Sequence, residues 1–124
     1  MVLTAADYDD ALHFYRDVLG LPEQAAFVDD NGGRATLLQA GRATIEIGDV
    51  AHAEAVDQVE VGRRVAGPVR LAFEVIDPTA ATDELAAAGA AVLAPPVRTP
   101  WGSLNSRLDG PDGQQLTLFA GDDA

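Results

Sequence analysis

The segment "VRLAFEV", residues Val69 to Val75, carries two charged residues in an otherwise apolar stretch. Side chains alternate along a β-strand, so Arg70 and Glu74 share one face while Leu71, Phe73 and Val75 share the other. A guanidinium and a carboxylate on one face can clamp the polar groups of a ligand, or can supply a general base beside an electrophile. Two other readings stay open, because this face can also lie in water or hold an ion pair with a structural role only.

Composition narrows the classes of partner. The chain has 124 residues, enough for one compact domain, and its 8 basic and 20 acidic residues give a net charge of −12. Nucleic acid and anionic membranes are disfavoured as partners, because both require lysine and arginine patches. The absence of cysteine excludes disulfides, thiolate catalysis and cysteine-based zinc sites. No apolar run of membrane-spanning length and no signal-peptide pattern occurs, so we expect a cytoplasmic location.

Two segments carry the capping and periodicity signals of helices. Each follows an aspartate that can cap the helix N-terminus and precedes a glycine that can end the helix. The predicted helices are Tyr8–Leu19, between Asp7 and Gly20, and Pro78–Ala88, between Asp77 and Gly89.

The remaining periodic segments predict strands, and the same order occurs twice: strand, helix, three strands. The two copies are offset by about 70 residues, as the caps Asp7 and Asp77 show. They form module one (1–47) and module two (68–124), joined by a polar linker (48–67) in which 51–56 could form a helical turn. The predicted strands are Val2–Ala6, Gln24–Val28, Arg34–Gln39, Ala43–Ile47, Val69–Val75, Ala91–Leu93, Ser103–Leu108 and Gln115–Phe119.

Three stretches carry a family resemblance: "DYDDALHFYRDVLGLP" (7–22), "VRLAFEVIDPTAATDELAAAGA" (69–90) and "TPWGSLNSRLDGPDGQQLTLF" (99–119). With these stretches the chain resembles the glyoxalase/bleomycin-resistance/extradiol-dioxygenase superfamily, also called the vicinal oxygen chelate superfamily. The resemblance implies an α+β fold with two βαβββ modules, whose sheets form a curved cup with helices outside. It further implies a single domain over residues 1–124 and a homodimer, since a partner subunit completes the cup in many members.

Enzymes of this superfamily commonly hold one divalent metal on His or Glu side chains from the first and fourth strands of each module. Carried over residue by residue, Glu46 matches one ligand position, whereas Arg70 stands where histidine is expected and Thr117 where glutamate is usual. The fourth position falls just before Met1. Arginine has no lone pair for a metal, so we expect no metal and no other cofactor.

The same resemblance places the face of Arg70 and Glu74 inside the cup, with Glu46 nearby. We expect the Arg70 guanidinium within hydrogen-bonding reach of Glu46 or Glu74, and these three residues are the candidate catalytic groups. The candidate ligand-binding residues follow from strand alternation and from the lone tryptophan, which can either stack on a flat ligand or pack on the core: Thr4, Thr44, Trp101, Gln115, Thr117 and Phe119. We expect a surface or packing role for His13, and for His52 either no role or a place at the mouth of the cup.

These residues favour a metal-free small-molecule binding protein resembling the bleomycin-type antibiotic-resistance proteins, with a cationic or aromatic ligand. One alternative is a glyoxalase-like lyase, isomerase or epimerase with Glu46 or Glu74 as general base, or a divalent-metal enzyme of the dioxygenase type. Another is a subunit without a ligand of its own. Whether the chain is an enzyme stays open at this point, because fold alone does not determine function.

Overall fold

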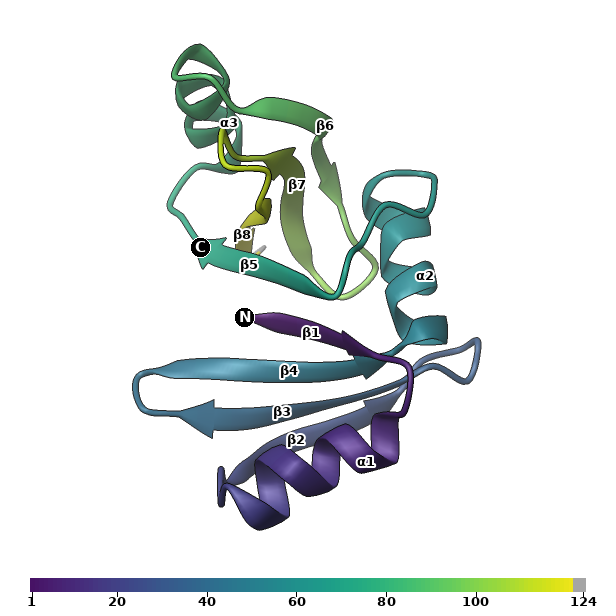
Figure 1. Ribbon diagram of the computed structural model, residues 1–124. Helices are drawn as coiled ribbons and strands as arrows, with labels where there is room; N and C mark the ends of the chain where they lie inside the picture. The colour runs from purple at the N-terminus through teal and green to yellow at the C-terminus, as the bar shows by residue number, and fades with distance from the viewer. Residues whose placement is uncertain (122–124) are drawn as a thin grey trace. The chain divides into compact units, whose positions relative to one another are not determined.

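The computed structural model describes residues 1–121, which divide into two compact units. The first unit comprises Met1–Val56 and Ala66–Val69, and the second comprises Asp57–Val65 and the described residues from Arg70 onward. Each unit contains one four-stranded sheet and one helix that follows the first strand of that sheet (Figure 1). The predicted α+β class with two βαβββ modules is therefore confirmed, whereas the cup formed by both modules stays a prediction.

In the first unit the strand order is β2-β3-β4-β1. Strand β1 runs parallel to β4, and the β2–β3 and β3–β4 pairs are antiparallel. The elements are β1 (Val2–Ala5), α1 (Tyr8–Leu12), the π-helical segment η1 (His13–Val18), β2 (Glu23–Val28), β3 (Arg34–Ala40) and β4 (Ala43–Asp49).

In the second unit the strand order is β5-β8-β7-β6, with β5 and β8 parallel and the other pairs antiparallel. The elements are β5 (Val69–Glu74), α3 (Pro78–Ala87), β6 (Ala91–Arg98), β7 (Ser103–Asp109) and β8 (Gln115–Gly121). Strand β6 is longer than predicted despite Pro95 and Pro96. Its position at the sheet edge and its register shifts accommodate residues that cannot donate a backbone hydrogen bond.

The first helix covers one face of its sheet through a small apolar core. Tyr8 and Leu12 of α1 pack against Leu38 of β3 and Ile47 of β4. The predicted cap is present, since the Asp7 side chain accepts a hydrogen bond from the Asp10 amide at 3.0 Å. The predicted single helix is instead an α-helical turn that widens into η1.

Helix α3, the helix of the second unit that follows β5, packs against β6, β7 and β8. The Asp77 carboxylate caps it by accepting hydrogen bonds from the amides of Thr79 and Ala80. Beneath α3, the Thr82 and Ser106 hydroxyls form a buried hydrogen bond of 2.7 Å. Ser106 therefore faces α3. Side chains alternate along a strand, so the neighbours of Ser106 in β7 point to the face opposite α3.

The largest departure from the sequence-based expectation is helix α2 (Val50–Glu60), which lies where we predicted a linker with one helical turn. Its buried residues are Asp57 and Glu60. An apolar stripe is the usual sequence signal of a helix, and a helix that buries carboxylates lacks that signal. None of the helices in residues 1–121 is long and apolar enough to cross a membrane.

Candidate functional site

In the first unit, the face of the sheet opposite α1 carries polar side chains of β4 and β1. Thr44 and Glu46 alternate along β4 with the core-facing residues Ile45 and Ile47. Glu46 pairs in register with Val2, so Thr4, two residues further along β1, lies on the same face. We call this surface the polar face of the first unit.

His52, in the first turn of α2, joins Glu46 to a second carboxylate. The His52 Nε2 atom lies 3.6 Å from Glu46 Oε1, and His52 Nδ1 lies 2.9 Å from Asp29 Oδ2. The His52 backbone amide donates to Asp49 Oδ1 at 2.8 Å. The imidazole is therefore held between two carboxylates, and its side chain is 16% exposed.

The turn between β2 and β3 holds Asp29 in position. Asp29 Oδ1 accepts hydrogen bonds from the backbone amides of Asn31 at 2.9 Å and Gly33 at 2.8 Å. A Cβ atom on Gly33 would lie 2.5 Å from Asp29 Oδ2 and 2.5 Å from the His52 backbone nitrogen. Only glycine fits at this position, so the turn and the start of α2 approach closely around the Asp29–His52 contact.

The two carboxylates change the acid–base properties of the group. The Glu46 carboxylate raises the pKa of His52, burial lowers it and the Asp29 carboxylate raises it again, so the net shift is upward. Burial acts to raise the pKa of Asp29, but hydrogen bonds from His52, Gly33 and Asn31 outweigh it and the pKa is lowered. The cluster can therefore hold a proton on His52 or accept a hydrogen-bond donor beside Glu46.

In the second unit, the face opposite α3 carries the predicted residues Arg70, Gln115 and Thr117. Arg70 is 8% exposed, and its Nη1 atom donates a hydrogen bond of 2.6 Å to Thr117 Oγ1. Glu74, at the end of β5, is exposed. The predicted pairing of Arg70 with Glu46 or Glu74 stays a prediction. We call this surface the polar face of the second unit.

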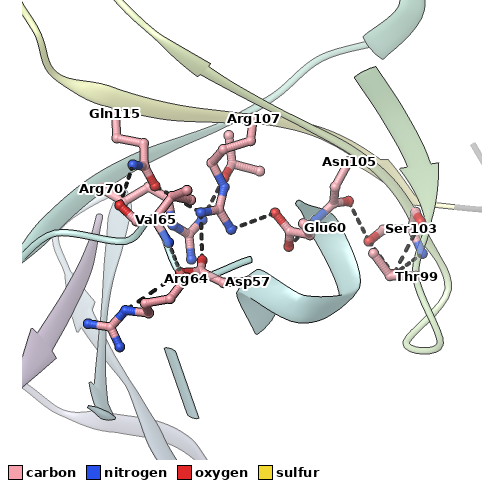
Figure 2. A network of polar contacts seen from close by, with 11 residues as sticks. Asp57, Glu60, Arg64, Val65, Arg70, Thr99, Ser103, Asn105, Arg107 and Gln115 are labelled. Carbon is pink, nitrogen blue, oxygen red and sulfur yellow. Dashed lines mark hydrogen bonds and ion pairs between the residues drawn. The ribbon is translucent and has the colours of Figure 1, made fainter. Parts of the chain in front are cut away.

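Arg107 of β7 lies at the centre of the hydrogen-bond network on this polar face (Figure 2). It was not identified from the sequence. It is fully buried. Its Nη1 atom donates to Asp57 Oδ1 and to Gln115 Oε1, both at 2.8 Å, and its Nη2 atom donates to Glu60 Oε1 at 2.9 Å. Gln115, which we predicted to bind a ligand, is therefore engaged with Arg107 and also donates to the Val65 carbonyl at 3.0 Å.

A chain of hydrogen bonds continues from Glu60 toward the β6–β7 turn. Asn105 Nδ2 donates to Glu60 Oε2 at 3.1 Å, Ser103 Oγ donates to Asn105 Oδ1 at 2.6 Å, and Thr99 bonds to Ser103 at 3.0 Å. Trp101 in this turn is 52% exposed, so it does not pack in the core. Phe119 of β8 is half-buried. Contacts of Trp101 and Phe119 with a ligand stay predictions.

The residues present do not fit the divalent metal that the resemblance implies. Within residues 1–121, no group of three or more histidine, aspartate or glutamate side chains is placed to hold a metal ion. Arg70 and Thr117, at two of the four expected ligand positions, are hydrogen-bonded to each other. The Glu46 carboxylate, at a third position, faces His52.

Residues 1–118 match the family profile described as "Glyoxalase/Bleomycin resistance protein/Dioxygenase superfamily". No curated protein sequence matches the chain significantly.

Several solved structures are similar in fold. A hypothetical protein from Bacillus halodurans C-125 is 20% identical, with a TM-score of 0.69, and the match covers 95% of this chain and 88% of that one. A methylmalonyl-CoA epimerase from Mycobacterium tuberculosis is 24% identical, with a TM-score of 0.63 and coverage of 95% and 83%. A triple mutant of 4-hydroxymandelate synthase from Streptomyces coelicolor is 27% identical, with a TM-score of 0.69. That match covers 94% of this chain and 36% of the synthase.

Proposed function

Because the chain belongs to the glyoxalase/bleomycin resistance protein/dioxygenase superfamily, we propose that it binds a small molecule without a metal. The observation that carries this proposal is the hydrogen bond of 2.6 Å from Arg70 to Thr117. It occupies two positions at which superfamily enzymes would supply metal ligands. A permanently charged guanidinium also repels a divalent cation, which supports a role carried by the chain's own side chains.

The polar face of the first unit supports a ligand with a cationic or hydrogen-bond-donating group. Glu46 and Asp29 place two negative charges around one imidazole, within a chain whose net charge is −12. When His52 is neutral and its Nδ1–H donates to Asp29, the Nε2 lone pair and Glu46 Oε1 are both acceptors. A protonated amine on an aromatic ligand would satisfy both of them.

Metal analysis and a thermal-shift screen test this proposal. We expect the purified protein to contain no stoichiometric zinc, iron or manganese, and a chelator to leave its Tm unchanged. A cationic aromatic compound should raise the Tm more than its neutral analogue does, and Glu46→Gln should remove that difference. Glu84→Gln, on the exposed surface of α3, is the control with the same change in charge. A tightly bound metal, or equal stabilisation by neutral analogues, would contradict the proposal.

A second candidate function is acid–base catalysis, as in an isomerase, epimerase or lyase. It is favoured by the Asp29–His52–Glu46 alignment, because a carboxylate that orients an imidazole is a common arrangement for proton transfer. In such a step Glu46 would take a proton from a carbon next to a carbonyl, and the electron pair of the broken C–H bond would move into an enolate. Exchange of that hydrogen for deuterium in D₂O, measured by NMR across a panel of 2-substituted carbonyl acids, distinguishes the two functions. Exchange that His52→Gln abolishes would favour the enzyme.

A homodimer and a cytoplasmic location remain part of the proposal. β2 and β6 lie at the edges of the strand order, and edge strands are commonly covered in proteins. We expect sedimentation equilibrium to give a dimer at tens of micromolar, a range chosen as roughly above a micromolar dissociation constant. A monomer at that concentration would count against the dimer.

A further inference from the structure

The polar face of the second unit collects positive charge in a chain that is otherwise strongly acidic. Arg70 and Arg107 lie on this face, and Arg64 Nε lies 3.7 Å from Asp57 Oδ2. In Figure 2 dashed lines join Arg107 to Asp57, Gln115 and Glu60, and Arg64 to Asp57. Three of the chain's 8 basic residues therefore meet at one place, where the network supplies two carboxylates, those of Asp57 and Glu60.

Both carboxylates come from outside the sheet, on the segment Asp57–Val65. The buried residues of α2 are these two acids, so polar contacts rather than an apolar stripe attach the last turn of the helix to the second unit. Buried ion pairs contribute little net stability, because the cost of removing their charges from water offsets the attraction between them. Since Arg107 needs a compensating negative charge while it is buried, the anion of a ligand can replace the carboxylate of Glu60 only by supplying that charge itself.

On one side of the Arg107 guanidinium group, only one of the two N–H donors makes a hydrogen bond. A guanidinium binds an oxyanion best when two parallel N–H groups meet two oxygens of the same anion. Here the carboxylates of Asp57 and Glu60 each supply one oxygen, to different nitrogens. Within residues 1–121, the buried Arg107 Nε has no hydrogen-bond partner, although it lies beside the Nη2 that holds Glu60.

We propose that this face binds the oxyanion of a small molecule, a carboxylate or a phosphate, across Nε and Nη2 of Arg107. Glu60 is the internal occupant that the oxyanion displaces, while Asp57 remains on Nη1. The ligand oxyanion meets both N–H groups on that side of the guanidinium, whereas Glu60 meets one. The residues of this site belong to the second unit and do not include Glu46 or His52, so the proposal stands whether or not the proposed function of the first unit holds.

Calorimetric titration with benzoate and with phenyl phosphate tests the proposal, with neutral benzamide as the uncharged control. Glu60→Gln removes the negative charge of Glu60 while nearly keeping the size of the side chain. We therefore expect the Kd of benzoate or of phenyl phosphate, or of both, to fall about tenfold from the wild-type value. Glu84→Gln on the exposed surface of α3 makes the same change in net charge, and we expect it to change the Kd by less than about twofold, since screening weakens distant charges. Tightening with benzoate alone or with phenyl phosphate alone supports the site and identifies its class of ligand.

The double variant Glu60→Gln/Arg107→Lys tests the geometry. Lysine keeps the positive charge but lacks the two parallel N–H groups, so the gain in affinity should disappear. The proposal is overturned if Glu60→Gln binds neither anion more tightly than Glu84→Gln does, or if the double variant keeps the gain.

The Arg107 Nε–H resonance provides a measurement that needs no variant to fold. In the wild-type protein this ¹⁵N-resolved signal should shift when benzoate or phenyl phosphate reaches tens of millimolar, a range suited to a Kd of roughly millimolar. It should stay in place with benzamide. A signal that neither anion moves, or that benzamide moves equally, overturns the proposal even if Glu60→Gln does not fold.

Discussion

The two units each hold a basic side chain between two carboxylates, but they differ in burial and in the basic group. In the first unit His52 lies between Asp29 and Glu46, and the three side chains are 16%, 21% and 22% exposed. In the second unit Arg107 lies between Asp57 and Glu60, and these side chains are 0%, 1% and 2% exposed.

The difference in basic group decides which cluster can change its protonation state when its neighbours change. An imidazole that loses a favourable neighbour can release its proton, so losing a carboxylate partner of His52 should cost less stability than losing one of Arg107. An arginine does not release its proton in a protein, so Arg107 requires its carboxylates for as long as it is buried. The first cluster is therefore suited to binding and proton exchange, whereas changes in the second should be felt mainly as stability or as exchange of one anion for another.

The largest expected effect is on the second unit. Arg107→Met leaves Asp57 and Glu60 buried without their partner, and we expect a loss of about 3–5 kcal/mol in the free energy of unfolding. Urea denaturation measures this loss. Replacing Arg107, Asp57 and Glu60 together by apolar residues should restore stability to within about 1 kcal/mol of wild type or raise it. An Arg107→Met variant as stable as wild type would show that the buried carboxylates of Asp57 and Glu60 do not depend on Arg107, and the two clusters would then not differ in this respect.

The next effect tests the close packing around His52. Gly33→Ala places a Cβ 2.5 Å from both Asp29 Oδ2 and the His52 nitrogen, so the turn must move. We expect a loss of about 1–3 kcal/mol, typical of overpacking, together with displaced His52 resonances in NMR spectra. Gly67→Ala is the control, since no atom lies within 4 Å of its new Cβ, and its effect should stay within about 0.5 kcal/mol. Equal effects at both glycines would show that the packing is not specific.

A smaller effect separates the two carboxylates of the first cluster. Asp29→Asn removes the charge that accepts a hydrogen bond from His52 Nδ1, and we expect the pKa of His52 to fall and stability to drop by about 1.5 kcal/mol. NMR titration of the His52 ring protons measures the change in pKa. Asp30→Asn, an exposed neighbour in the same turn, should leave both quantities unchanged. A His52 pKa that is insensitive to Asp29 would mean that Glu46 alone governs the imidazole.

The smallest effect is the pH dependence of stability. The pKa of His52 is raised in the folded state, so its contribution is fully present below the unfolded value of about 6.5 and is lost as pH rises through the folded value. The difference in unfolding free energy between wild type and His52→Gln should therefore be larger at about pH 5.5 than at about pH 8.5. Asp29, whose pKa is lowered, stays ionised over this range. If the difference in unfolding free energy between wild type and His52→Gln grows toward alkaline pH, the pKa of His52 is lowered in the folded state and not raised.

Several parts of the fold could be predicted because their signals are local. Asp7 and Asp77 cap their helices as expected, and Gly20 and Gly89 follow with φ values of 88° and 113°. Strand alternation placed Arg70 and Glu74 on one face, and the family resemblance grouped that face with Thr117, whose hydroxyl accepts a hydrogen bond from Arg70. For helix α2 only one helical turn within a linker was predicted, because its buried side chains are acids and acidic residues are typical of a polar linker.

The candidate site was predicted in part. Glu46 was identified on its strand, but His52 was assigned to a linker, and its contact with Asp29 spans a turn and a helix start. Arg107 was overlooked, although a charged residue between Asn105 and Leu108 in a strand was a usable signal. Its partners Asp57 and Glu60 lie about 50 residues away, and no local rule connects positions that far apart.

The family resemblance implied that Arg70 and Thr117 stand where metal ligands are expected. The sequence by itself determined the two βαβββ modules and the caps and turns that bound them. These properties depend on residue type and on short-range periodicity. Only the tertiary structure decided which carboxylate meets which base. Asp29 reaches His52 because Gly33 permits close approach, and the acids of α2 reach Arg107 because that helix ends over the second sheet. Hydrogen bonds form at donor–acceptor distances of about 3 Å, and only folding brings residues so distant in the chain that close.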